Sequence, residues 1–432
     1  MIKNSKDSKL QTKDEYKKYT YDMFMFNMVS DLDEIDQFHK WISSMESNNE
    51  YTFEAPRKGA QKTNVEIIRE NKTLSVLNFS SYNYLGFGYH PDVIKAAKDS
   101  LDIYGLGAAS SPVISGTYSI HKELESAILD YFDLPGYGIS LFSSGYAVNT
   151  GTIQAFMKKG GRIIVDKSAH MSILEGAQLC GAEISYFAHN NTDELEALLK
   201  KYCDEWTRVL ICVEGVYSAD GDYGNLKDIV KLAKKYGAYT LVDEAHSVLV
   251  AGENGRGVSE EHGVLDEVDL YVMTFSKAFG GVGGALLAKK EITRYVNWYA
   301  RCRMFSCALD PAVTGGLVKV VELAKGSEGR LRRKKIKENS NYFINLLSSR
   351  INCGNSVSWI VPVMYNSESN TIDLNNYLQH NGLDSSIVQF PAVPKNEARL
   401  RMFVTSEHTK YQLDKASLII FEAAERFGFQ KI

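Results

Sequence analysis

Apolar and polar positions change their spacing along the chain. Between residues 21 and 45, apolar side chains recur at helical spacing among acidic ones (Phe24, Met28, Leu32, Ile35, Phe38, Trp41). This spacing predicts one or two amphipathic helices that pack on the main body. Two β-rich runs follow, 65–68 and 74–79, and Glu70-Asn71-Lys72 separates them. These runs predict a small hairpin.

From residue 90 onward, helical and β-rich segments alternate. The predicted helices are Pro91–Leu101, His121–Phe132, Thr192–Tyr202 and Leu226–Tyr236, with Thr192 as a cap and Gly237 as a stop. The predicted strands are Ile163–Val165, Val209–Val213, Tyr239–Val242, Leu270–Thr274 and Ala285–Ala288. Their residues are apolar on both faces, as in buried parallel strands. The alternation predicts an α/β domain with a mainly parallel sheet covered by helices on both sides.

After residue 310 a long helical stretch leads into a second region. Strands are predicted at 357–363, 386–388 and 400–404, and helices at 374–380 and 412–427. This order predicts a smaller α+β domain. We therefore expect an N-terminal helical arm and hairpin over 1–80, a large α/β domain over 81–310 and a small domain over 311–432.

Composition narrows the class of protein. The 432 residues include 49 Lys+Arg and 53 Asp+Glu, a net charge of −4, and 44% are hydrophobic. These values exclude a disordered tail, a collagen-like fibre and a strongly basic nucleic-acid binder. The six cysteines contain no C-x-x-C pair, so no metal site is predicted. With no apolar run of about eighteen residues and no apolar signal core, we expect a cytoplasmic protein.

The candidate chemistry follows the predicted strands. Ligands of parallel α/β sheets bind at the carboxyl ends of the strands, so the residues just after each strand are candidates. These exits carry Ser144-Gly145-Tyr146, His170, Glu214 to Ser218, Asp243 with His246, and Thr274 with Ser276 and Lys277. Because the carboxyl ends of parallel strands share one edge of a sheet, we expect these side chains to lie together.

This set of residue types suits pyridoxal phosphate (PLP). Lys277, in a dry pocket, has the amine needed for a Schiff base, and Asp243 can hold the ring nitrogen in its protonated form. The Ser144-Gly145-Tyr146 turn can offer backbone N–H groups to the phosphate, and Thr274 and Ser276 can add hydroxyls. His170 can lie flat against the ring.

Each of these residues also has an ordinary structural interpretation. Lys277 could lie on the surface, Asp243 could cap a helix, and His170 and His246 could be core histidines. Together these interpretations need several independent coincidences at one edge of one sheet. Patterns for rival chemistries, such as the Walker A loop, the dinucleotide fingerprint, the nucleophile elbow and the zincin motif, do not occur in the sequence.

Longer motifs carry a family resemblance. They are Asn78–Gly86, Ser115-Gly116-Thr117 with His121–Glu125, Glu214–Gly221, Val242–Ser247, Gly255-Arg256-Gly257, Thr274–Lys277 and Ala398–Arg401. Through them the chain resembles the α-oxoamine synthases, which are fold-type I PLP enzymes, from about Asn78 to Thr409. Members include serine palmitoyltransferase, 8-amino-7-oxononanoate synthase, 2-amino-3-ketobutyrate CoA ligase and 5-aminolevulinate synthase.

The resemblance implies a role for each matching residue. Lys277 would form the Schiff base and move the Cα proton, Asp243 would pair with the ring nitrogen, and His170 would stack on the ring. His246 and Ser218 would contact the phenolic oxygen, and Gly145, Tyr146 and Thr274, with Ser144 and Ser276, would hold the cofactor. Arg401, in preference to Arg399, would bind the amino-acid carboxylate, with Asn83 also on the substrate side. Ser306 would reach the phosphate of a neighbouring subunit.

The implied reaction is the decarboxylative condensation of a small amino acid with an acyl thioester. The acyl group would be carried on CoA or on an acyl carrier protein. The implied enzyme is a homodimer with its site at the interface. Pro112, Leu249 and Ala308 depart from residues common in the family and leave the substrates open. The form of Tyr82–Gly86 is similar to serine palmitoyltransferase, which favours a long acyl chain. The alternatives are an activity like that of the oxononanoate or ketobutyrate enzyme, another fold-type I reaction such as amino transfer, and a non-catalytic partner subunit.

Overall fold

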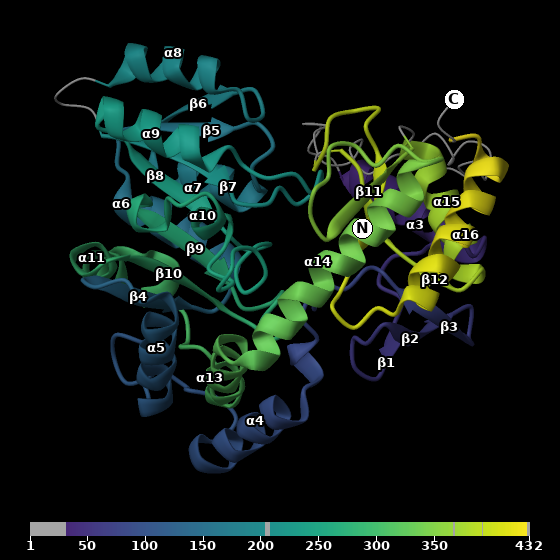
Figure 1. Cartoon of the computed structure of the whole chain (residues 1–432), viewed down its shortest axis with the longest axis horizontal. Coiled ribbons are helices and arrows are strands. Elements are labelled where there is room, and N and C mark those ends of the chain that lie inside the picture. The colour runs from purple at the N-terminus through teal and green to yellow at the C-terminus, as the bar shows by residue number, and fades with distance from the viewer. Residues whose placement is uncertain (1–31, 204–207, 366–367, 391, 430–432) are drawn as a thin grey trace, which may run out of the picture.

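The computed structural model describes residues 32–203, 208–365, 368–390 and 392–429, and it shows a large and a small lobe side by side (Figure 1). A seven-stranded sheet of order β4-β10-β9-β8-β7-β5-β6 forms the centre of the large lobe. Its strands are β4 (Tyr137–Phe142), β5 (Arg162–Asp166), β6 (Glu183–Phe187), β7 (Val209–Glu214), β8 (Tyr239–Asp243), β9 (Leu270–Thr274) and β10 (Gly284–Lys289). The predicted α/β fold with a mainly parallel sheet is confirmed.

Strand β10 is the exception to the parallel pairing. It runs antiparallel to both β4 and β9, so the expectation of a parallel strand over 285–288 was wrong. The reason is the short connection 275–283 between β9 and β10, since a parallel return needs a crossover of about a dozen residues or more. The burial pattern misled because both faces of β10 are covered, like those of its parallel neighbours.

Two layers of helices cover the faces of this sheet. One layer holds α6 (Gly145–Phe156), α7 (Met171–Cys180) and α11 (Lys290–Tyr299), and the other holds α5 (Ser119–Phe132), α8 (Thr192–Tyr202) and α9 (Leu226–Tyr236). Successive strand residues point into opposite layers: Leu241 packs in the first and Val242 in the second. The five strands that the sequence predicted are therefore buried on both faces, as expected, whereas the edge strand β6 is partly exposed.

The helix ends follow from local capping. The four helices predicted between residues 91 and 236 are all present, and the first of them is α4 (Pro91–Tyr104). Gly237 ends α9 at a φ of 66°. The expectation that Thr192 caps α8 was wrong, because the Asn191 side chain accepts the hydrogen bond from the Glu194 N–H at 3.1 Å. Asparagine reaches this N–H group from one residue earlier, so Thr192 becomes the first helical residue.

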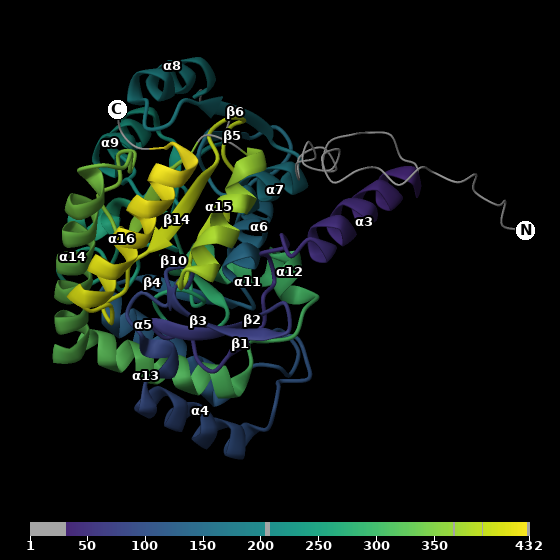
Figure 2. The ribbon, with the colours of Figure 1, turned by 90° about the vertical axis from the view of Figure 1, so that its right-hand side faces the viewer.

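The small lobe is built on a three-stranded antiparallel sheet of order β11-β14-β13. Its elements are the long helix α14 (Ser327–Ser348), β11 (Ile360–Met364), α15 (Glu368–His380), β13 (Ser386–Val388), β14 (Arg399–Phe403) and α16 (Lys410–Phe427). Figure 2 shows α14, α15 and α16 lying alongside this lobe. The predicted α+β region is confirmed, with the ends of some elements shifted.

The predicted hairpin is also present and joins a second sheet. β2 (Asn64–Arg69) pairs antiparallel with β3 (Lys72–Asn78), and β1 (Arg57–Lys58) adds to its edge. The short strand β12 (Leu383–Asp384) pairs with β3 in parallel. Farther along the chain, α13 (Pro311–Lys325), which we expected to open the small domain, packs on α4 and α5 of the large lobe. The three-part division of the chain stays a prediction.

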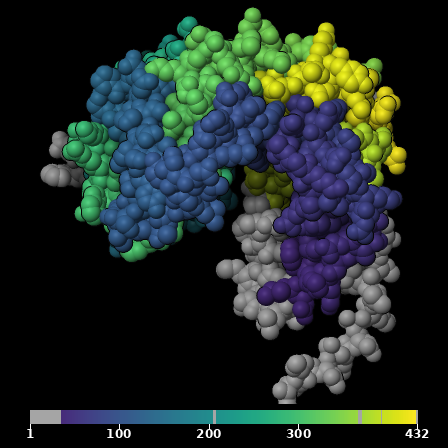
Figure 3. Space-filling view, turned by 90° about the horizontal axis from the view of Figure 1, so that it is seen from below, coloured from purple at the N-terminus to yellow at the C-terminus, as the bar shows by residue number. Residues whose placement is uncertain are grey.

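The N-terminal helix α3 (Leu32–Ser47) extends from the body in Figure 2. It overlaps the helical stretch predicted over 21–45 and ends two residues beyond it, and residues 21–31 of that stretch are outside the described part. Short elements complete the chain: η1 (Phe87–Tyr89), α10 (Val258–Glu261), η2 (Leu265–Glu267) and α12 (Arg301–Met304). Seen from below, the molecule is hollowed between the N-terminal segments, in purple, and the large lobe, in blue and green (Figure 3).

Candidate active site

The residues that follow the parallel strands meet at one edge of the large sheet. β8 ends at Asp243 and β9 at Thr274, with Lys277 in the loop beyond, and His170 follows β5. Glu214, at the end of β7, pairs in register with Asp243. The sequence therefore predicted this shared edge correctly, and we call these residues the strand-exit cluster.

Hydrogen bonds link Asp243 to His170 through two residues that the sequence analysis gave no role. Asn149 of α6 donates from Nδ2 to Asp243 Oδ2 at 2.7 Å and to Ser172 Oγ at 2.9 Å. Ser172 Oγ lies 2.8 Å from His170 Nδ1. The Ala245 N–H donates to the other Asp243 oxygen at 2.9 Å. Asp243 is thus a buried carboxylate in a fixed orientation, held by neutral donors.

Lys277 is placed as a nucleophilic amine. Burial lowers the pKa of its ammonium to about 8, against the opposing effect of Asp243 and Glu214, and Arg401 lowers it further. At neutral pH a usable fraction of this amine is therefore unprotonated, whereas an ordinary lysine at pKa 10.5 would be almost wholly charged. Lys277 is half-buried, so it keeps some access to solvent.

The two histidines of the cluster differ in exposure. His246 is buried, with its Nδ1 2.7 Å from the Tyr84 hydroxyl, and burial followed by Lys277 lowers its pKa well below 6.5. His170 caps α7 and its side chain is open to the cleft. Surrounding protein atoms and Lys277 nevertheless lower the pKa of His170. Both rings are therefore neutral at pH 7, and only the His170 ring faces a ligand-sized space.

Glu214 is a buried carboxyl that supports His170. Its Oε1 accepts the His170 N–H at 2.6 Å. Burial, and then the nearby Asp243, raise its pKa well above 4.5. Burial and the neighbouring Asp243 therefore favour the neutral form of Glu214 over its carboxylate.

The turn before α6 forms a cradle for an anion. Ser144 caps α6 by accepting from the Ala147 N–H at 3.1 Å, and the N–H groups of Gly145 and Tyr146 belong to the first turn, which has no intrahelical acceptors. A Cβ atom on Gly145 would lie 2.7 Å from Thr274, so only glycine allows this approach. Thr274 Oγ1 lies 2.9 Å from Ser276 Oγ, which adds hydroxyl groups to the cradle.

Arg401 and Arg399 lie on β14 with different partners. Arg399 is buried in ion pairs with Asp220 and Glu397. Arg401 donates to the Ser218 carbonyl at 2.7 Å and stacks over the Phe403 ring, and within the described residues it forms no ion pair. A guanidinium without a protein carboxylate is available for the carboxylate of a substrate.

Asn83 lies beside the Lys277 loop. Its Oδ1 accepts the Gly88 N–H at 3.3 Å. Gly280, at a φ of 71°, approaches Gly88 so closely that a Cβ atom on Gly280 would lie 2.4 Å from Gly88 Cα. The segment predicted to hold substrate therefore contacts the loop that carries the lysine.

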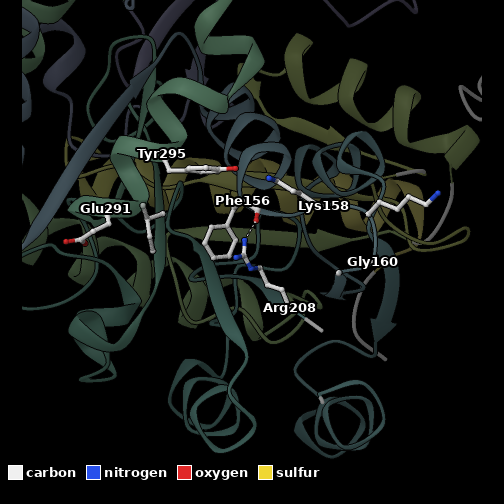
Figure 4. Close-up of a pocket in the computed structure, with 9 residues that line it drawn as sticks. Phe156, Lys158, Gly160, Arg208, Glu291 and Tyr295 are labelled. Atoms are coloured by element: carbon white, nitrogen blue, oxygen red, sulfur yellow. Dashed lines mark hydrogen bonds between the residues drawn. The ribbon is translucent and has the colours of Figure 1, made fainter. Parts of the chain in front are cut away.

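A cavity of about 600 Å³ reaches the strand-exit cluster at His170, and Ser218 and Arg401 also line it. We call it the α3 cavity, because α3 forms one of its walls. A second cavity of about 710 Å³ lies at the opposite edge of the sheet, where β5 and β7 begin, and Figure 4 shows Lys158, Arg208 and Tyr295 around it. No residue of the strand-exit cluster lines this second cavity, so the candidate chemistry belongs to the smaller one.

Ser306 is the predicted site residue that the single chain leaves apart. It follows α12, and its hydroxyl has only a weak contact, 3.5 Å, with the Cys307 carbonyl. Among the departures, Ala308 donates to the Ser110 carbonyl at 3.0 Å, and the Pro112 carbonyl accepts from Thr117 Oγ1 at 2.7 Å. Leu249 is buried at a φ of 67°. This left-handed conformation is strained for leucine, whereas glycine adopts it without strain.

These residues fit PLP. The set provides an amine with a lowered pKa, an oriented buried carboxylate, an exposed imidazole and an N-terminal cradle that a Cβ atom would close. The sequence analysis placed Glu214 at a strand exit without giving it a role, and it missed Asn149, Ser172 and Tyr84 as members of the site. Asn149 had a usable signal, because it follows Gly145 by four residues and therefore shares its helix face.

Comparisons with known proteins agree with this geometry. Residues 75–418 match the family model "Aminotransferase class I and II". An 8-amino-7-oxononanoate synthase from Alkaliphilus metalliredigens is 39% identical over 81% of this chain and 88% of its own. A serine palmitoyltransferase from Sphingobacterium spiritivorum is 33% identical over 89% of this chain and 95% of its own.

Solved structures extend the match to the fold. A serine palmitoyltransferase from S. paucimobilis, solved with a PLP–myriocin aldimine, superposes with a TM-score of 0.85 and 30% identity, over 92% of this chain and 99% of the other. In the described residues no helix is long and apolar enough to cross a membrane. On its sequence, its fold and its strand-exit cluster, the chain belongs to the α-oxoamine synthases, a family of fold-type I PLP-dependent acyl-transferring enzymes.

Proposed function

We propose that this enzyme condenses a small amino acid with an acyl thioester, in the manner of serine palmitoyltransferase. The observation that carries the proposal is that one sheet edge holds Lys277, whose pKa is lowered to about 8, and the oriented carboxylate of Asp243, whose charge acts on it. Arg401, which also acts on the pKa of Lys277, has no carboxylate partner in the described chain. Bound PLP supplies an electron sink for the charge left on the substrate Cα. The match to serine palmitoyltransferase also extends over more of the chain than the match to the oxononanoate enzyme.

Arg401 and Lys277 have separate parts in the proposed reaction. Arg401 binds the amino-acid carboxylate, and Lys277 binds the cofactor and afterwards takes the Cα proton at Nζ. A bond forms from Cα to the acyl carbon, the thioester C–S bond breaks, and the thiol leaves with a proton. The bond from Cα to the carboxylate breaks to give CO2, and Cα regains a proton. The product is an α-aminoketone.

The remaining residues position the cofactor. Asp243, held by Asn149, would pair with the ring nitrogen, and His170 would stack on the ring. His246 and Ser218 would bind the phenolic oxygen. Gly145, Tyr146, Thr274 and Ser276 hold the phosphate, and this assignment is supported by the cradle at the start of α6.

The proposal includes a homodimer with its site at the interface. Leu106, Ile114 and Phe305 are each 81% exposed, and the Ala308–Ser110 hydrogen bond joins the two segments that carry them. An apolar patch of this kind is typical of a surface that another protein covers. A second copy on this patch would bring Ser306 to the partner's phosphate. A cytoplasmic location is also proposed, supported by the free thiols of Cys180, Cys212, Cys302 and Cys307.

An 8-amino-7-oxononanoate synthase activity is the second candidate, because the relative of that name has the higher identity, 39%. The test is release of labelled CO2 from carboxyl-labelled serine, alanine and glycine by the holoenzyme, with and without acyl thioesters. We expect release that requires a thioester and is abolished in Lys277→Ala. Amino transfer to a 2-oxo acid without CO2 release would instead establish an aminotransferase, and colourless protein with no PLP affinity would establish a non-catalytic subunit.

A further inference from the structure

The α3 cavity has an apolar wall that comes from the N-terminal helix. Phe38, Trp41, Ile42 and Met45 recur at i, i+3, i+4 and i+7 and so share one face of α3, and all four line the cavity. Trp41 and Met45 are 4% and 6% exposed. The face of α3 that the sequence shows as apolar is therefore turned toward the cavity.

The rest of the lining is mixed, with apolar side chains in the majority. Ile387 and Val388 of β13 and the adjoining Phe390 are apolar members of it. Among the described residues that line the cavity, Arg401 is the one Lys or Arg side chain, and Glu54, which accepts from the Tyr51 hydroxyl at 2.8 Å, is the one carboxylate. A ligand that fills this space thus meets mostly hydrocarbon, with Arg401 and His170 of the strand-exit cluster among the polar groups.

The size of the cavity exceeds the needs of a small amino acid. If each methylene takes roughly the volume share of one water molecule, about 30 Å³, a chain of about sixteen carbons needs roughly 480 Å³. The cavity holds about 600 Å³. It can therefore accommodate a long hydrocarbon chain, whereas a chain that ends in a carboxylate would find no cation along the described apolar walls.

From this arrangement we propose that the cavity binds the hydrocarbon chain of the acyl thioester and that α3 determines the chain length accepted. The inference rests on the proposed function, because the thioester carbon must reach the strand-exit cluster. Ile42 is the key position, since it is half-buried in the cavity wall and a larger side chain there would shorten the space. Ile35 on the same helix is 65% exposed and does not line the cavity, which makes it the matched control.

The test compares the PLP-loaded wild type with Ile42→Trp and Ile35→Trp. Calorimetry would measure the Kd of S-alkyl coenzyme A thioethers with six, ten and sixteen carbons, which bind without reacting. For the wild type we expect Kd to fall up to about fourfold per methylene as the chain lengthens within the cavity. Ile42→Trp should keep wild-type affinity for the six-carbon probe and lose the gain at sixteen carbons, and Ile35→Trp should behave like the wild type.

A Kd that does not depend on chain length in the wild type would overturn the inference, as would equal effects of the two tryptophan substitutions. CO2 release from the amino acid, measured on the same samples with a six-carbon thioester, reports separately on the proposed function. If CO2 is released but the Kd does not depend on chain length, the proposed function holds and the role of α3 is contradicted. If the Kd depends on chain length but no CO2 is released, the role of the cavity in binding holds and the proposed function is contradicted.

Discussion

Asn149 Nδ2 lies 2.7 Å from Asp243 Oδ2, and this contact orients the Asp243 carboxylate. Both side chains are buried, so the bond forms away from water. A buried hydrogen bond to a charged group stabilises more than one at the surface. In the proposed function, the amide would therefore act on the cofactor through Asp243, as a positioning residue.

Replacing this amide should weaken cofactor binding without unfolding the protein. We expect Asn149→Leu to raise the Kd for PLP about tenfold, because Asp243 loses a donor worth about 1.5 kcal/mol. The measurement is a titration of apoenzyme with PLP followed by visible absorbance. Thr152→Val is the control, since the Thr152 hydroxyl is buried on the same helix with no partner in the described structure. An unchanged Kd in Asn149→Leu would show that Asp243 holds its orientation unaided.

The lowered pKa of Lys277 predicts how cofactor attachment depends on pH. Only the neutral amine attacks an aldehyde, so the rate of covalent attachment to apoenzyme should rise between pH 6 and 8 and level off above the pKa of about 8. Stopped-flow absorbance would measure the rate, and borohydride fixation with peptide mapping would place the cofactor on Lys277. A rate that keeps rising to pH 10, as for free lysine, would contradict the lowered pKa.

Substitutions of Arg401 and Arg399 should affect different properties, substrate binding in the first case and stability in the second. Arg401→Lys loses the paired N–H donors that fit a carboxylate, so we expect the KM for the amino acid to rise at least about tenfold while the melting temperature stays near that of the wild type. Arg399→Lys should lower the melting temperature, because its partners Asp220 and Glu397 are set around a buried guanidinium. The reverse pattern of effects would assign the carboxylate to Arg399.

Leu249 offers a test of backbone strain. Its φ of 67° disfavours any side chain, while its buried side chain packs in the core. Both Leu249→Ala and Leu249→Gly should destabilise the protein by about 2–4 kcal/mol through lost packing. The glycine variant should be the more stable of the two by about 1 kcal/mol, because it relieves the strain. Urea unfolding would compare them, and an alanine variant as stable as the glycine variant would argue against strain here.

His189 predicts a pH-dependent contribution to stability. Burial alone would lower its pKa, but hydrogen bonds to Asp166 and Asp222 raise it to about 10. A pKa raised above the unfolded value of about 6.5 stabilises the fold fully below pH 6.5, and this contribution fades as the pH rises through 10. His189→Gln should therefore lower the free energy of unfolding by about 2 kcal/mol at pH 6 and by less at pH 10. A deficit independent of pH would show that His189 is neutral in the folded protein.

The sequence predicted the helices, most of the strands and the edge of the sheet where the chemistry lies, because each depends on local spacing or on the rule for parallel strands. It failed where the outcome depended on pairing across the fold. The direction of β10 followed from its connection to β9, and its burial pattern alone could not show this. The role of Asn149 required knowing that α6 runs past the end of β8.

The predictions for the cap of α8 and for the position of α3 fell short for different reasons. Asn191 and Thr192 are both good capping residues one position apart, and only the backbone geometry chooses between them. The amphipathic pattern of α3 predicted an apolar face but not what that face covers, which is a ligand-sized cavity as well as the protein core.

The pairing of β12 with β3 bears on how the chain is made. Residues 72–78 leave the ribosome early, whereas the strand that completes their sheet, 383–384, is near the other end of the sequence. The edge of β3 that pairs with β12 therefore stays unpaired while the large lobe is translated and folds. Removing the last fifty residues of the chain should consequently leave an aggregation-prone nascent product rather than a smaller working enzyme.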